Sequence, residues 1–307
     1  MADTLFGQLC WAIRNRWGEA KLQTLLKGYT AGQPFLVVSD AFPSGYIPRP
    51  ALPAHFFRSV DSDRKEAKKK KWLPVDKVNE PVTDWLRHCV GSEELPEAHE
   101  IARSQPHNTI NRQTETTGRG MFAPYAMEQY WYLKQRAARS NGTFWAETGS
   151  LDIYLISDST RFSIAELKTA LSDIGHVGFG RDASIGLGRF DVDAIEERNL
   201  PSQAGANAWL TLGPCAPQGT PLDPRRSFYQ VFTRFGRHGD IEVLRRSPFK
   251  TPILMAAGGA VLSPLVFEAR SFIGQGLGGD GSLSKSLPQT VHQGYTPVIG
   301  ICLPSLE

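Results

Sequence analysis

A glycine-rich stretch at residues 174–190, IGHVGFGRDASIGLGRF, holds the residue types best suited to chemistry. Glycine adopts backbone angles closed to other residues and lets another chain approach the main chain closely. Backbone N–H groups and arginine guanidinium groups suit phosphate oxygens, whether of a nucleotide or of a nucleic acid. The residues that we expect to contact phosphate here are Gly178, Gly180, Arg181, Ser184, Gly186, Gly188 and Arg189.

The letters of this stretch also fit a dinucleotide-binding fingerprint, G-x-G-x-x-G/A, at Gly178–Ala183. That fingerprint belongs between a strand and a helix. The preceding residues, 163–174, instead predict a helix, because apolar residues recur at helical spacing after a Ser163 N-cap. A second match at Gly274–Gly279 precedes a polar segment with Pro288, where we expect no useful helix. A nucleotide-dependent enzyme is therefore the weaker alternative.

A polar stretch at residues 105–125, QPHNTINRQTETTGRGMFAPY, is rich in turn-forming residues and does not suit a core. We expect it to line a groove or to protrude from the fold. Arginine beside aromatic residues suits single-stranded RNA, because guanidinium groups contact phosphates and rings stack on bases. The RNA contacts expected in this stretch are His107, Asn111, Arg112 and Arg119.

A basic run, RKEAKKKK, occupies residues 64–71. Most charge runs are solvated loops, and that is the simpler interpretation. The sharper interpretation is an electrostatic landing surface for an RNA backbone. The two are compatible, because a loop can become ordered when it binds.

Composition limits the possible classes of protein. The chain has 307 residues and 34 basic against 31 acidic side chains, so a nucleic-acid surface must be a local patch. Its four cysteines include no C-x-x-C pair, which disfavours a zinc ribbon or a disulfide scaffold and favours a cytoplasmic protein. The apolar run 253–267 is too short to span a bilayer. Residues 99–103 miss the H-E-x-x-H zinc motif, so we expect no metal and no cofactor.

Apolar spacing predicts the elements that position these residues. One helix begins after Asp3 as N-cap and ends at Gly18, and a second covers 19–28. The tail, 272–295, is expected to be a flexible loop that brings His292 and Tyr295 to RNA. Further predicted elements are a short helix near 82–89 and strands at 35–39, 143–157, 187–192, 207–212, 228–235 and 261–269.

Four blocks in a fixed order carry a family resemblance. They are Asp3–Trp11 (DTLFGQLCW), Pro34–Pro43 (PFLVVSDAFP) leading to Pro48-Arg49-Pro50, Gly178–Phe190 (GFGRDASIGLGRF) and His292–Tyr295 (HQGY). Together they resemble RAMP-superfamily CRISPR proteins of the Cas-five type, and most of all the fourth Csm subunit of type III-A effector complexes.

This resemblance implies an α+β fold of two ferredoxin-like (RRM-like) units with long loop insertions. Residues 1–140 are expected to form an N-terminal unit with the basic loop and a thumb-like insertion, and 141–307 a C-terminal unit with the glycine-rich loop. The N-terminal unit lacks the family's first strand. Either the start codon is placed late, or something else supplies that sheet edge.

The resemblance also implies a function: a non-catalytic subunit that holds the 5′ repeat handle of crRNA. Its expected partners are that handle, a large polymerase-like Cas subunit, the repeated backbone RAMP subunit and, indirectly, target RNA, with no membrane. Related proteins include ribonucleases, so a metal-independent endoribonuclease that processes repeat RNA is the main alternative. Its candidate general acids or bases are His107, His176 and His292.

Overall fold

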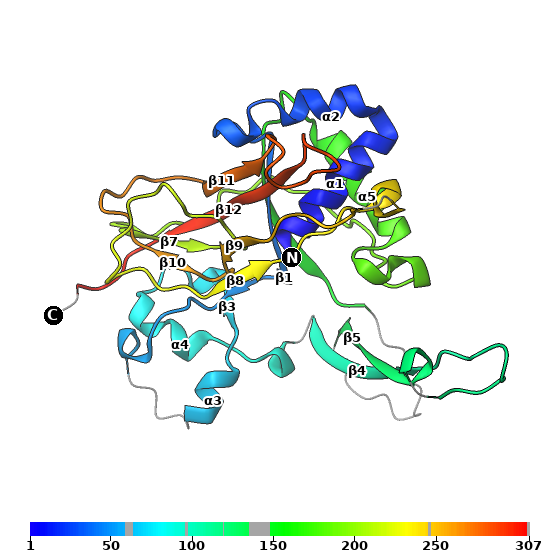
Figure 1. The fold of residues 1–307 in the computed structure, drawn as a ribbon. Coiled ribbons are helices and arrows are strands. Elements are labelled where there is room, and N and C mark those ends of the chain that lie inside the picture. The colour runs from blue at the N-terminus through cyan, green and yellow to red at the C-terminus, as the bar shows by residue number, and fades with distance from the viewer. Residues whose placement is uncertain (59–63, 96–97, 119, 135–147, 245–246, 306–307) are drawn as a thin grey trace.

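Three helices cover one side of the protein (Figure 1). They are α1 (Ala2–Trp17), α2 (Glu19–Leu26) and α5 (Ile164–Val177). Helix α5 begins at the Ser163 N-cap, whose hydroxyl accepts the Glu166 N–H as the Glu166 carboxylate accepts the Ser163 N–H, a capping box. The computed structural model describes residues 1–58, 64–95, 98–118, 120–134, 148–244 and 247–305.

Two sheets lie beneath these helices. Strand β1 (Leu36–Pro43) pairs antiparallel with β6 (Leu151–Ser157), with an irregularity between Val38 and Ala41. The larger sheet has the order β10-β7-β12-β11, and every pairing in it is antiparallel. Its strands are β7 (Ala208–Thr211), β10 (Val261–Leu262), β11 (Phe272–Gly278) and β12 (Val291–Ile301).

Three antiparallel ribbons complete the described strands. Ribbon β2 (Tyr46–Pro48) with β3 (Trp72–Pro74) lies near the short helices α3 (Arg64–Lys69) and α4 (Trp85–His88). Ribbon β4 (His99–His107) with β5 (Tyr125–Leu133) projects away from the rest of the molecule (Figure 1). The third ribbon is β8 (Val231–Arg234) with β9 (Ile253–Ala256).

The hydrophobic cores join the two halves of the chain. One core packs Phe6, Phe35 and Val38 against Phe162 and Leu171. A second joins residues of the 42–89 region to β7 and β12. The expected boundary at 140/141 lies outside the described residues, and the β1–β6 sheet crosses it. The described parts of the two halves therefore share cores, because strands from both are needed to bury α1 and α5.

Several predicted elements are confirmed and several are wrong. Helices α1, α2 and α5 and strands β1, β6, β7 and β8 occur where the apolar spacing predicts them. The basic run is not a loop, because residues 64–69 form α3. Residues 187–192 form no strand, and Asp3 lies inside α1 instead of capping it. The α+β class is confirmed, whereas the division into two ferredoxin-like units stays a prediction.

The tail, residues 272–295, is not the flexible loop that its glycines predict. It forms β11 and β12, which pair from Phe272–Pro297 to Gly278–Val291. Its glycines permit close packing of main chains: a Cβ at Gly274 would collide with the Gly294 carbonyl oxygen. A Cβ at Gly276 would come within 2.6 Å of the Tyr29 carbonyl oxygen. Glycine inside a strand marks such close approaches.

Candidate nucleic-acid interface

The glycine-rich loop folds back onto the end of α5. The Gly178 N–H donates to the Ile174 carbonyl at 2.6 Å and closes the helix. Within the loop the Phe179 N–H donates to the Gly188 carbonyl at 2.7 Å, and the Phe190 N–H returns the loop to α5 by donating to the Gly175 carbonyl at 3.3 Å. The loop is therefore an ordered element with its own hydrogen bonds.

Its glycines fall into two groups. At Gly175, Gly178 and Gly188 a Cβ would collide with a main-chain carbonyl oxygen of the same loop. At Gly180 and Gly186 an added Cβ meets nothing within 4 Å, and both residues have positive φ, 100° and 88°. The missing side chains of the first group allow the loop to fold on itself. At the second group there is free space beside the main chain.

The open part of the loop carries polar and basic residues. Ser184, Gly186, Gly188 and Arg189 are exposed, and the backbone of Arg181 begins a 3-10 turn at residues 181–185. The segment that follows is acidic, with exposed side chains at Asp191, Asp193, Glu196 and Glu197. In this region a polyanion would therefore meet favourable charge at the loop and repulsion from the acidic segment after it.

The β4–β5 ribbon has two chemically different faces. Opposed residues of an antiparallel pair share a face, and successive residues alternate between faces. One face bears Arg103, Gln105, His107, Tyr125 and Trp131. The His107 ring stacks on that of Tyr125, with centroids 5.4 Å apart and planes 15° apart. This face combines a cation with stacked rings, the combination that holds single-stranded nucleic acid.

The opposite face is acidic and rich in tyrosine. It bears Glu100, Glu128, Tyr130 and Tyr132, and the Tyr130 hydroxyl donates to the Glu128 carboxylate at 3.0 Å. Carboxylates repel RNA phosphates, so this face does not suit the backbone of a nucleic acid. The two faces therefore favour different binding partners.

The predicted thumb is the tip of this ribbon. The Asn111 side chain accepts the Gln113 N–H at 2.9 Å, and the Asn111 N–H donates to the Thr116 carbonyl at 3.0 Å. Asn111 thus shapes the turn, and the exposed Arg112 lies beside it. Arg119 lies outside the described residues.

His292 and Tyr295 lie in the core and not at a surface. The Tyr295 side chain is 2% exposed, and its hydroxyl donates to the Tyr29 carbonyl at 2.6 Å. His292 Nε2 lies 3.4 Å from Asp3 Oδ2. Burial lowers the pKa of His292 to about 4 despite the opposing charge of Asp3, so the ring is neutral at pH 7. Neither side chain therefore reaches a surface where RNA could contact it.

Buried polar contacts surround His292. The Arg234 guanidinium pairs with both carboxylate oxygens of Asp3, and its Nη2 also donates to the Thr4 hydroxyl at 2.8 Å. Lys250 is close enough to influence the charge of His292, and burial lowers the Lys250 pKa. The Arg234 bonds to Asp3 and Thr4 join β8 to α1, which is a structural role.

The histidines proposed for RNA cleavage lie on three elements. His107 is in β4, the exposed His176 is in the last turn of α5, and His292 is buried in β12. Among the residues that the structure describes, no group of three or more His, Cys, Asp or Glu residues is arranged to hold a metal ion. Within the same residues, no helix is long and apolar enough to cross a bilayer.

Sequence reasoning missed an exposed apolar surface on the β8–β9 ribbon. Val231 is 60% exposed and Leu254 58%, and the strand register places them on one outer face. Phe235 continues this face at 75% exposure, and Phe249 follows near the Arg237 guanidinium. We call Val231, Phe235, Phe249 and Leu254 the apolar ribbon. Clustered exposed apolar side chains of this kind mark interaction surfaces.

Comparison with solved structures places this fold among known proteins. A crystal structure of a Csm1–Csm4 cassette in complex with pppApA matches with a TM-score of 0.60 and 19% identity, covering 99% of this chain and 92% of that chain. The same cassette in complex with cA4 matches with a TM-score of 0.59 and 18% identity, over the same shares. No family model and no curated protein sequence matches the chain.

These matches show that the chain shares the α+β fold of proteins solved in Csm1–Csm4 cassettes. More narrowly, the chain has the fold of Csm4 over almost its whole length. The family resemblance of the four sequence blocks is thus confirmed at the level of the fold. At this identity the match establishes the fold alone.

Proposed function

We propose that the chain is the crRNA-binding subunit of a type III, Csm-type CRISPR interference complex. In this role it holds the 5′ repeat handle and bridges the large polymerase-like subunit to the repeated backbone subunits. The observation that carries the proposal is a fold match over 99% of the chain to proteins solved as Csm1–Csm4 cassettes. Three surface features support it.

The first is the glycine-rich loop. The open space at Gly180 and Gly186, beside the exposed Ser184 and Arg189, would let the handle's backbone approach the loop closely, although the Gly186 N–H already donates to the Ala183 carbonyl. Arg181 would add a second guanidinium group. A-form grooves offer few readable base edges, so the subunit would recognise splayed, single-stranded nucleotides.

The second feature is the projecting β4–β5 ribbon. Its face with Arg103, His107, Tyr125 and Trp131 would grip a neighbouring stretch of RNA, helped by Arg112 at the tip. Arg119 is retained in this proposal from the sequence alone. The acidic face would be turned toward a protein with a basic surface.

The third feature is the apolar ribbon on β8 and β9. A single protein rarely exposes several large apolar side chains together, and an assembly subunit must bury a surface against its partners. This ribbon is where we place a protein contact with the rest of the complex. In this role the chain acts by binding and not by catalysis.

Assembly tests this proposal. The full chain should co-purify with a type III large subunit and a backbone subunit when a crRNA with its repeat handle is present. The double variant Val231→Ser and Leu254→Ser should lose at least about ten-fold in assembly affinity, because truncating buried interface side chains costs about 1–2 kcal/mol or more each. Thr233→Ser, on the same outer face, is the matched control.

Two results would contradict the proposal. One is failure of the chain to join the two subunits and the crRNA. The other is metal-independent, site-specific cleavage of repeat RNA by the purified chain that His107→Ala abolishes. The second result would identify the endoribonuclease alternative.

A further inference from the structure

Strand β8 lies at the edge of a two-stranded ribbon whose other strand is β9. In an antiparallel pair, alternate residues exchange main-chain hydrogen bonds with the partner strand, and the residues between them point their main-chain groups the other way. The Gln230 carbonyl accepts the Ala257 N–H at 2.8 Å, and the Gly236 carbonyl accepts the Lys250 N–H at 2.8 Å. The even-numbered residues of this stretch therefore bond toward residues 250–257.

The odd-numbered residues Val231, Thr233 and Phe235 consequently point their N–H and carbonyl groups away from β9. Within the described part of the chain, no hydrogen bond to these main-chain groups is found. The side chains of all three residues are exposed, so the edge is open to solvent. An open strand edge is a template on which another chain can pair.

The open edge carries none of the usual protection against such pairing. Edge strands are commonly protected by lysine, by proline or by a covering segment. Arg234 is the one charged residue between Tyr229 and Phe235, and its guanidinium is bound to Asp3 and Thr4. The exposed residues of β8 are thus uncharged, and the apolar ribbon lies beside them. These are the properties of an edge that a partner covers.

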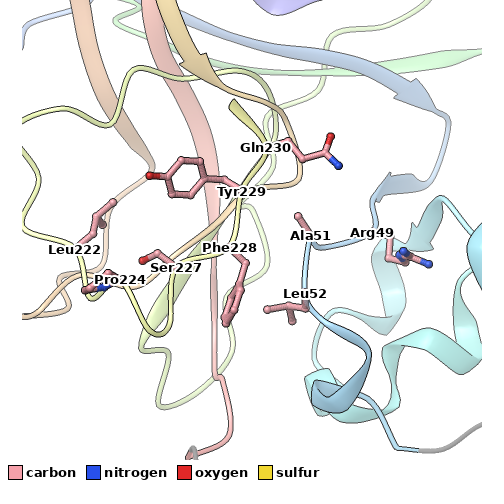
Figure 2. A pocket seen from close by; sticks show the side chains of 9 residues that line it. All are labelled: Arg49, Ala51, Leu52, Leu222, Pro224, Ser227, Phe228, Tyr229 and Gln230. Carbon is pink, nitrogen blue, oxygen red and sulfur yellow. The ribbon is translucent and has the colours of Figure 1, made fainter. Parts of the chain in front are cut away.

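The exposed row begins before β8 itself. Figure 2 shows this part of the chain, where residues 49–52 and 222–230 line a cleft of about 640 Å³. The side chains of Tyr229 and Gln230 point to opposite sides, as successive residues of a strand do. Tyr229 is 43% exposed and precedes Val231 in the row. From Tyr229 to Phe235 the row has the length of an ordinary strand, about 5–6 residues.

Exposed arginines flank the row at both ends, Arg225 before it and Arg237 after it. The nearby carboxylates already accept hydrogen bonds: Asp223 from the Arg225 N–H at 2.9 Å, and Asp240 from the Asn15 amide at 2.7 Å. Two copies of this chain paired edge to edge would bring arginines together at each end. The charge therefore favours a different chain, with acidic residues at those positions.

We propose that the outer edge of β8 receives an extended segment of a partner protein, which adds to the ribbon as a strand. Its main chain bonds to Val231, Thr233 and Phe235, and its alternate apolar side chains cover the apolar ribbon. Its acidic side chains lie near Arg225 and Arg237. In strand addition of this kind, main-chain bonds supply affinity and alternate side chains supply specificity.

This inference rests on the proposed function, because it takes the partner to be a subunit of the same complex. It specifies how that partner covers the apolar ribbon.

Hydrogen exchange tests the inference on the full chain, first alone and then assembled with a type III large subunit, a backbone subunit and crRNA. In the free chain the N–H groups of Val231 and Thr233 should exchange rapidly. Those of Phe232 and Arg234, which bond toward β9, should exchange slowly. In the complex, exchange at Val231 and Thr233 should become at least about ten-fold slower.

Thr233→Pro removes one outward N–H and leaves the apolar ribbon unchanged. An edge strand tolerates proline where the N–H faces solvent, so the free variant should keep its fold, which thermal melting checks. Its assembly should weaken by at least about ten-fold, because a buried carbonyl of the partner loses its donor. Thr233→Ser keeps the N–H and should assemble like the wild type.

Four results would overturn the inference. If the complex forms but Val231 and Thr233 exchange as fast as in the free chain, side chains alone make the contact, and the proposed function stands. Wild-type assembly of Thr233→Pro leads to the same conclusion. Protection that appears in the purified chain and rises with its concentration identifies a second copy as the occupant. If the chain does not join the two subunits and crRNA, the proposed function fails together with the inference.

Discussion

The side-chain amide of Gln293 bonds to both main-chain groups of Val38. Gln293 Nε2 donates to the Val38 carbonyl at 2.8 Å, and Gln293 Oε1 accepts the Val38 N–H at 2.9 Å. The pair is fully buried. A side chain of β12 thus satisfies β1 as a neighbouring strand would, on the side of β1 away from β6. The Gln293–Val38 interaction links the two sheets. The Gln293 residue of the HQGY block therefore has a structural role.

Removing this amide should be costly. Gln293→Leu would leave the Val38 N–H and carbonyl buried without partners, at about 1–3 kcal/mol each, so we expect a loss of about 2–6 kcal/mol in unfolding free energy. Chemical denaturation measures it, with Gln23→Leu on the exposed side of α2 as the control. Equal midpoints for the two variants would show that the Gln293 amide contributes little.

His292 should make stability fall in weak acid. Its folded pKa of about 4 lies below the ordinary value of about 6.5, so the unfolded chain binds a proton that the folded chain does not. The contribution is therefore fully present above pH 6.5 and is lost progressively as the pH falls toward 4. We expect His292→Gln to have a flatter stability profile in this interval. An identical slope for variant and wild type would assign the acid sensitivity to other groups.

The two groups of loop glycines should respond differently to substitution. Gly188→Ala would drive a Cβ into the Phe179 carbonyl at a φ of 72°, so we expect a loss of more than about 1 kcal/mol. Gly186 has a left-handed backbone conformation, and there is open space where a side chain would begin. Asparagine tolerates that conformation, so Gly186→Asn should lower the unfolding free energy much less. Hydrogen exchange at the Phe179 N–H, which bonds to the Gly188 carbonyl, reports loop opening. Equal protection of the Phe179 N–H from exchange in both variants would contradict the division of the loop glycines into two groups.

The sequence predicts elements whose apolar residues repeat regularly and misses those held by distant contacts. Helix α5 is found from Ser163 and its apolar spacing because both signals are local. Strand β11 is missed because its glycines resemble those of a loop. The strand needs them because the main chains of Tyr29 and Gly294 pack closely against it, a contact between distant segments. Asp3 resembles an N-cap, but its partner Arg234 lies 231 residues away.

The candidate site follows the same pattern. The exposed glycine loop is anticipated from residue types alone, since glycine and arginine at that density have few other uses. Burial of His292 and Tyr295 follows from the pairing of β12 with β7 and β11, which no local pattern reveals. The cleft and the apolar ribbon combine segments that meet only in the folded chain. Sequence spacing therefore carries no signal for either.

The most direct test of the account is the salt dependence of handle binding. Each phosphate contact to a single strand contributes about −0.7 to the slope of log K against log salt concentration. The double variant Arg181→Ala and Arg189→Ala should weaken binding of a 5′-handle RNA and flatten this slope by up to about 1.4. Arg270→Ala, an exposed arginine outside the loop, should leave the slope unchanged. A double variant with the wild-type slope would remove the glycine-rich loop from the RNA interface and contradict the account.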